Sequence, residues 1–111
     1  MTRKVKVERG SDNIFADLGF ADAETHLLKA EIVAELYRMT AERKLTQERA
    51  GKLMGISQPE VSRMFRGHFR EYSIERLMGF LTTFNRDVEI LVRPRHKSRT
   101  VGKIRFTTEP A

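Results

Sequence analysis

Apolar residues recur at helical spacing in two long stretches of this chain. The first stretch covers residues 23–43, where Asp22 can cap the start of a helix, and the second follows Ser73 and ends near Asn85. Residues three or four positions apart lie on one face of a helix, so each stretch predicts a helix with one apolar stripe. The stripes consist of Leu28, Ile32, Leu36 and Met39 in the first helix and Ile74, Leu77, Met78, Leu81 and Phe84 in the second.

Between these stretches, the segment LTQERAGKLMGISQPEVSRMFRG at residues 45–67 predicts two short helices joined by a tight turn. The hydroxyl of Thr46 can accept from an unpaired amide of the first helix, which we expect to end before Gly55. Glycine adopts the left-handed conformation of such a turn at little cost. Gly51 falls where we expect the helices to cross most closely.

The second short helix carries its own start signals. Ser57 and Glu60 have the spacing of a capping box, and Pro59 falls in the first turn, where an amide has no partner anyway. Apolar residues of both helices and the turn would close a small core: Ala50, Met54, Ile56, Val61 and Met64. The spacing is that of a helix-turn-helix that lays its second helix in the major groove of DNA, and the alternative is an ordinary helical hairpin.

Alternating patterns at both ends predict strands. DVEILVR at residues 87–93 places Val88, Ile90 and Val92 on one face, and KVKVE at residues 4–8 is a candidate edge strand. An unpaired strand edge can be satisfied by a second chain, so we expect residues 87–93 to pair across a two-fold axis in a homodimer. The alternative is pairing within one chain, with KVKVE or with VGKIRFT at residues 101–107.

The 111 residues are enough for one small domain with a modest core. We expect an N-terminal arm at residues 1–22, a helical bundle at 23–86, a dimerisation strand at 87–93 and a basic tail at 94–111. Apolar residues of the arm, Ile14, Phe15, Leu18 and Phe20, are expected to pack against the bundle.

Positive charge is concentrated on the short helices and the tail. The chain has a formal net charge of +6, and residues 46–70 hold five basic residues against two acidic ones, whereas residues 1–45 hold eight of each sign. A basic surface on the motif suits a polyanionic partner. The tail, usually a mobile element, could follow DNA phosphates, fold on a partner protein through Ile104 and Phe106, or remain solvated.

Several other function classes are disfavoured. The chain has no cysteine and no apolar run long enough for a signal peptide or membrane span, so we expect a cytoplasmic protein without a membrane partner. The three histidines, His26, His68 and His96, are not spaced as a paired acid and base, and no metal or phosphate-loop pattern is present. We therefore expect neither enzymatic activity nor a cofactor or metal.

The segment GISQPEVSRMFRG, with the helix before it, closely resembles the Xre-type helix-turn-helix of the lambdoid phage repressors. The resemblance implies a mainly α, lambda-repressor-like bundle, to which we add the short C-terminal β-strand. It also implies base contacts from the start and outer face of the second helix, at Gln58, Pro59, Ser62 and Arg63. Their chemistry agrees, because Gln can pair with adenine and Arg with guanine. Pro59 departs from the hydrogen-bonding residue that many relatives carry. Phosphate contacts are implied at Thr46, Gln47, Arg66, His68 and Arg70.

Over residues 13–95, the chain is similar to the HigA-like antitoxins that accompany toxins of the RelE superfamily. The similarity is carried by NIFADLGF, LLKAEIVAEL, the motif itself and SIERLMGFLTTFNRDVEILVRP. It implies a dual role, in which a dimer binds a palindromic operator of its own operon and also neutralises an mRNA-cleaving toxin. A stand-alone phage-type repressor with no toxin partner is the alternative.

Overall fold

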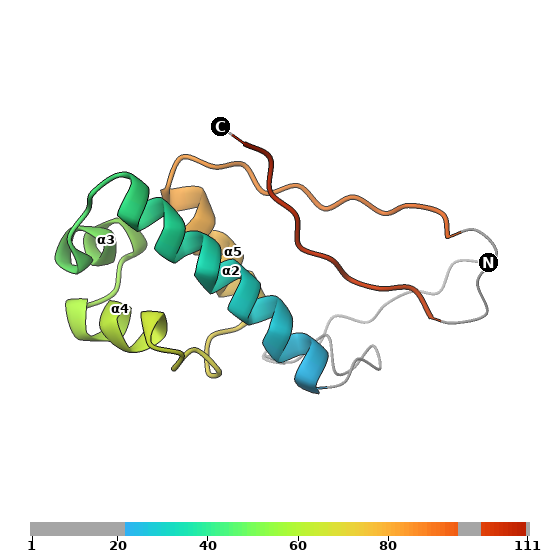
Figure 1. Cartoon of the computed structure of the whole chain (residues 1–111), viewed down its shortest axis with the longest axis horizontal. Coiled ribbons are helices and arrows are strands. Elements are labelled where there is room, and N and C mark those ends of the chain that lie inside the picture. Colours follow the sequence, from blue (N-terminus) through green and yellow to red (C-terminus); the bar gives the residue numbers. More distant parts are fainter. Residues whose placement is uncertain (1–21, 96–100, 111) are drawn as a thin grey trace.

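The structure is a computed structural model that describes residues 22–95 and 101–110. Within the described residues four helices form a bundle: α2 (Asp22–Glu42), α3 (Gln47–Met54), α4 (Gln58–Phe65) and α5 (Ile74–Thr83). The long α2 packs along α5, and α3 packs mainly against α4 at one end of the molecule (Figure 1). The mainly α helix-turn-helix bundle expected from the sequence is confirmed.

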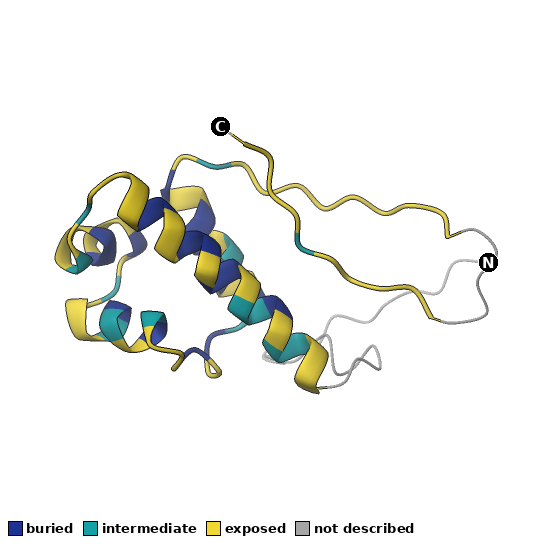
Figure 2. Ribbon diagram, viewed as in Figure 1, coloured by how far each residue is buried: buried dark blue, intermediate teal, exposed yellow. Residues whose placement is uncertain are grey.

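The predicted apolar stripes form the core. Leu36, Met39, Leu77 and Phe84 are fully buried, and the inward faces of all four helices line the same interior (Figure 2). Burying large aliphatic and aromatic side chains in this way supplies most of the driving force for folding. Aromatic residues that the stripes did not include complete the core: Phe69, Tyr72 and Phe80.

A partly buried ion pair between Arg38 and Glu35 stabilises helix α2. The guanidinium of Arg38 donates to both carboxylate oxygens of Glu35, at 2.9 and 2.6 Å, and also to Glu42 at 3.2 Å. Hydrogen bonding by Arg38 lowers the pKa of Glu35 below its ordinary value, against the opposing effect of burial. The sequence assigned Asp22 as the cap of this helix, but Asp22 lies within its first turn.

Side chains bind the free backbone groups at both ends of α5. The hydroxyl of Ser73 accepts from the amide of Arg76, as predicted for the N-cap of α5. At the other end of α5, Arg43 donates to the carbonyl of Phe84 and lies 5.4 Å from the centre of its ring. A cation beside the last carbonyls of a helix is favourable because those carbonyls carry partial negative charge.

The predicted strand at residues 87–93 does not form with any other described residue. Residues 86–95 are extended. Residues 86–94 make no backbone hydrogen bond with any described residue, and the described part of the chain contains no strand. The alternating pattern sets a strand's two faces but cannot supply the neighbour whose hydrogen bonds define a sheet. The described residues therefore give no support for the strand, and its pairing across a dimer stays a prediction.

The described part of the basic tail turns back toward the helices. Residues 86–95 and 101–110 form two extended segments on the side of the bundle away from α3 and α4 (Figure 1). Phe106 is half-buried against the core, whereas Ile104 is 43% exposed. Two predictions concern residues outside the described ranges: the edge strand at KVKVE and the packing of Ile14, Phe15, Leu18 and Phe20 against the bundle.

Candidate nucleic-acid interface

Helix α3 begins and ends as its sequence predicts. The hydroxyl of Thr46 accepts a 3.1 Å hydrogen bond from the amide of Arg49, and Gly55 closes the helix with φ of 78°. The amides of Gly55 and Ile56 both donate to the carbonyl of Gly51, at 2.7 and 2.9 Å. These bonds turn the chain sharply enough for α4 to start within a few residues.

Gly51 is required by the close approach at this turn. A Cβ atom at this position would lie 2.5 Å from the carbonyl oxygen of Ile56 and 3.3 Å from a methyl group of Val61. The first distance is far below van der Waals contact, and the obstacle is backbone that cannot swing away. The predicted close approach at Gly51 is confirmed, and the nearest atom belongs to Ile56 in the turn between the helices.

Helix α4 starts with the predicted capping box. The hydroxyl of Ser57 accepts from the amide of Glu60, and the carboxylate of Glu60 accepts from the amide of Ser57 at 2.9 Å. The hydrogen bond from the Ser57 backbone is the main cause that lowers the pKa of Glu60 below its ordinary value. The carboxylate is therefore ionised at neutral pH, the form that the cap needs.

The four candidate base-contacting residues share the outer side of α4. Gln58, Pro59 and Arg63 are exposed and Ser62 is half-buried, whereas Val61 and Met64 on the opposite side are fully buried in the core. Core packing thus fixes the rotation of α4 about its axis. That rotation turns the residues with hydrogen-bonding side chains outward.

A hydrogen bond joins the first residues of the two short helices. The side-chain amide nitrogen of Gln58 donates to the side-chain oxygen of Gln47 at 2.8 Å. The bond fixes the plane of the Gln58 amide and leaves its oxygen available to accept from a base. It also brings the positively polarised N-termini of α3 and α4 together, which favours an anion such as a phosphate.

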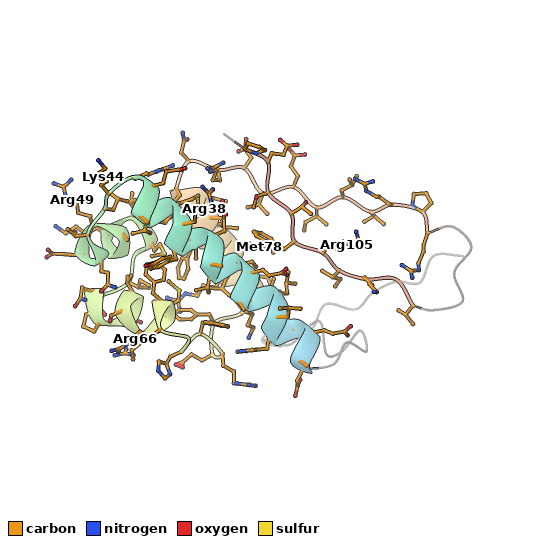
Figure 3. All side chains as sticks on the ribbon, in the orientation of Figure 1. Arg38, Lys44, Arg49, Arg66, Met78 and Arg105 are labelled. Atoms are coloured by element: carbon orange, nitrogen blue, oxygen red, sulfur yellow. The ribbon has the colours of Figure 1, made fainter. Side chains whose placement is uncertain are left out.

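The candidate phosphate-contacting residues fall into two groups at opposite ends of α4. Thr46 is exposed and Gln47 half-buried beside the N-terminus of α4, while Arg66, His68 and Arg70 are exposed beyond its C-terminus. Figure 3 shows Arg66 at the far end of α4 from Arg49, which projects beside α3. An eight-residue helix is about 12 Å long. The two groups therefore flank the outer face of α4.

The loop after α4 is held by contacts that the sequence did not predict. The ammonium of Lys29 on α2 donates to the carbonyl of Arg70 at 2.7 Å, and the ring of His26 stacks on Phe69 at 4.9 Å. The amide of His68 also donates to the carbonyl of Arg63 at 2.9 Å. The two contacts from α2 join residues 41 and 43 positions apart, so no local pattern could have indicated them, whereas the bond between His68 and Arg63 is local.

Sequence reasoning also missed the link between Gln47 and Gln58, because it gave Gln47 a phosphate contact alone. The only available signal was that each glutamine follows directly after an N-cap.

The three residues of the proposed dimer face lie apart from α4, on the extended segment after α5. Val88, Ile90 and Val92 are 37%, 79% and 86% exposed there.

No helix within residues 22–95 and 101–110 is long and apolar enough to cross a membrane. No group of acidic, histidine or cysteine side chains in these ranges could hold a metal ion. His96 lies outside them.

Comparison with known proteins agrees with this geometry. A family of proteins described as having a helix-turn-helix domain matches residues 14–93. A solved structure assigned as an XRE family transcriptional regulator is 31% identical, with a TM-score of 0.75, and the match covers 80% of this chain and 100% of that one. No curated protein matches the chain. The chain belongs to the XRE family of DNA-binding helix-turn-helix transcriptional regulators.

Proposed function

We propose that the chain is a dimeric repressor that binds a palindromic operator with α4 in the major groove. The hydrogen bond between Gln58 and Gln47 carries this proposal, because it orients an amide at the exposed start of α4 before any DNA is bound. A preoriented amide pairs with the edge of an adenine at a smaller entropic cost than a freely rotating one.

The roles of the other surface residues follow from their places around α4. Arg63 reads guanine, and Pro59 and Ser62 offer apolar contact to a thymine methyl group. Thr46 and Gln47 bind a phosphate on one side of α4, and Arg66, His68 and Arg70 bind phosphates on the other. Phosphate contacts position the helix, while the base contacts select the sequence.

A homodimer is part of the same proposal. Val88, Ile90 and Val92 lie on an extended segment whose residues 86–94 have no backbone hydrogen-bond partner among the described residues, and a second copy can supply one. Two α4 helices related by a two-fold axis would reach half-sites about 34 Å apart.

We further propose that the protein is an antitoxin, which represses its own operon and neutralises an mRNA-cleaving toxin of the RelE superfamily. The support is the similarity to HigA-like antitoxins over residues 13–95, together with apolar surface left exposed away from α4. In this proposal the protein binds its partners and catalyses no reaction. It acts in the cytoplasm, where both the operator DNA and the toxin would be found. A stand-alone repressor with no toxin partner is the second candidate, since it would use the same DNA surface.

Operator binding is tested by fluorescence anisotropy with the protein's own upstream promoter and a scrambled duplex, at two salt concentrations. We expect preference for the promoter to persist at the higher salt, because base contacts depend less on released counterions than phosphate contacts do. Equal and salt-sensitive binding to both duplexes would contradict the proposal.

The antitoxin role needs a separate experiment. The product of the adjacent gene is expressed alone and together with this chain, and growth and mRNA cleavage are followed. We expect the product to be toxic alone, and co-expression to restore growth through a complex that co-purifies. A harmless neighbour that does not co-purify would favour the stand-alone repressor.

A further inference from the structure

The extended segment after α5 exposes apolar side chains to an unusual degree. Ile90, Leu91 and Val92 are 79%, 71% and 86% exposed, although most large apolar side chains of the helices are buried (Figure 2). Backbone amides and carbonyls of residues 86–94 also make no hydrogen bond with another described segment. A second strand would satisfy the backbone and cover these side chains together.

The order of charges along this segment indicates that the second strand is the same segment of another copy of the chain. Acidic residues stand two and four positions before Leu91, at Glu89 and Asp87, and basic residues stand two and four positions after it, at Arg93 and Arg95. When two copies of a strand pair antiparallel about a two-fold axis through Leu91, residues equally far from it on either side face each other. Every acid in the pair then faces a base.

We propose that two copies of this chain pair antiparallel through residues 87–95, with Leu91 facing Leu91 on the two-fold axis. Glu89 of each copy faces Arg93 of the other, and Asp87 faces Arg95. This inference rests on the proposed homodimer and gives it a register. The interface is isologous, as closed dimers require.

The opposite face of the paired strands fits the same register. There Ile90 faces Val92 and Val88 faces Pro94, so an apolar pair recurs on each side of the axis. If Leu91 forms a hydrogen-bonded pair with its counterpart, the alternation of an antiparallel ladder places Pro94 at a non-hydrogen-bonded position. Proline has no amide hydrogen to donate, so this position is one that it tolerates.

Other registers lose this match. A two-fold axis through Ile90 would place Glu89 opposite Leu91 and Arg95 opposite Asn85, which leaves two of the four charged residues without an oppositely charged partner. Cross-strand pairs of opposite charge stabilise a sheet and like-charge pairs destabilise it. An axis through Val92 would place Arg93 opposite Leu91, so the Leu91 axis is the one that pairs all four charged residues of this segment with one another.

Single cysteines test the register directly, because the full chain contains none of its own. In the proposed register only Leu91→Cys places two cysteines opposite each other, with Cα atoms about 5.5 Å apart, a distance that a disulfide spans. Ile90→Cys and Val92→Cys are matched controls, since their counterparts lie diagonally at about 7–8 Å. We expect mild oxidation to give a covalent dimer fastest with Leu91→Cys.

Charge reversal provides a second test on the full chain. Glu89→Arg and Arg93→Glu each create two like-charge pairs, so we expect each variant alone to form dimers about 10- to 30-fold more weakly than the wild type. Mixed together, the two variants restore both pairs in a heterodimer. Sedimentation of differently tagged chains measures all three affinities.

The outcomes separate this register from the proposed function. Fastest cross-linking of Ile90→Cys or Val92→Cys, or failure of the charge variants to form a heterodimer, would overturn the register while a dimeric repressor stood. A wild-type chain that stays monomeric both free and on operator DNA would overturn the register and the proposed homodimer together. Promoter preference in the anisotropy titration is measured independently of either result.

Discussion

Gln58 donates a 2.8 Å hydrogen bond from its side-chain amide to the side chain of Gln47, across the turn between α3 and α4. The two residues are the first of their helices. Each follows an N-cap residue whose hydroxyl accepts a hydrogen bond from a backbone amide. The caps fix the backbone at both positions, so the side-chain bond joins two rigid points. An amide held in this way presents a defined donor and acceptor pattern outward.

Removing the partner of Gln58 should weaken operator binding. Gln47→Ala leaves the Gln58 amide free to rotate, and a typical net hydrogen bond of about 0.5–1.5 kcal/mol corresponds to a loss of about 2- to 13-fold in affinity. Anisotropy titrations of Gln47→Ala, Gln58→Ala and the double variant complete a double-mutant cycle. Strictly additive losses would show that the bond has no part in DNA recognition.

Arg63 and Arg66 should respond differently to DNA sequence. Arg63→Ala is expected to cost about 1–3 kcal/mol on the operator and much less on random DNA, because a base contact is lost. Arg66→Ala, just beyond α4, should weaken both duplexes alike and reduce the salt slope by about 1. Titrations on both duplexes over a salt series compare the two variants. Equal losses for Arg63→Ala on both duplexes would remove it from the base-reading set.

Two glycines provide a matched test of the packing at the turn. Gly51→Ala places a methyl group 2.5 Å from a backbone oxygen and should destabilise the fold by about 1–3 kcal/mol. Gly79→Ala, in the middle of α5, meets nothing within 4 Å and should stabilise it by about 0.5–1 kcal/mol. Urea denaturation measures both changes. A Gly51→Ala variant as stable as the wild type would contradict the close approach.

The features that the sequence predicted correctly are local ones. Thr46, Gly55 and the Ser57–Glu60 box act within a single turn of the chain, so their spacing alone determines what they can bond. The apolar stripes were also found because burial and helical periodicity coincide. The base-reading and phosphate roles remain predictions, resting on exposure around α4.

The features that the sequence did not predict depend on distant parts of the chain or on a second molecule. Lys29 reaches the carbonyl of Arg70 only because α2 passes the loop after α4. No strand forms at residues 87–93 among the described residues, because alternation alone does not make a strand without a partner. Pairing of this segment across a dimer stays a prediction.

The ion pair on α2 predicts how stability changes in acid. Hydrogen bonding by Arg38 lowers the pKa of Glu35 in the folded protein, so ionised Glu35 stabilises the fold above its unfolded-state pKa. That stabilisation is lost as the pH falls through the folded-state pKa. Glu35→Gln should therefore be less stable than the wild type at neutral pH, and the difference should shrink toward zero in acid.

Thermal unfolding followed by circular dichroism between about pH 7 and pH 2 measures this difference. Glu31→Gln is the matched control, because Glu31 is exposed on the same helix and takes no part in the Arg38 pair. We expect its difference from the wild type to vary much less with pH. If the gap between Glu35→Gln and the wild type stayed constant down to the lowest pH, packing around residue 35 would account for it and the ion pair would not.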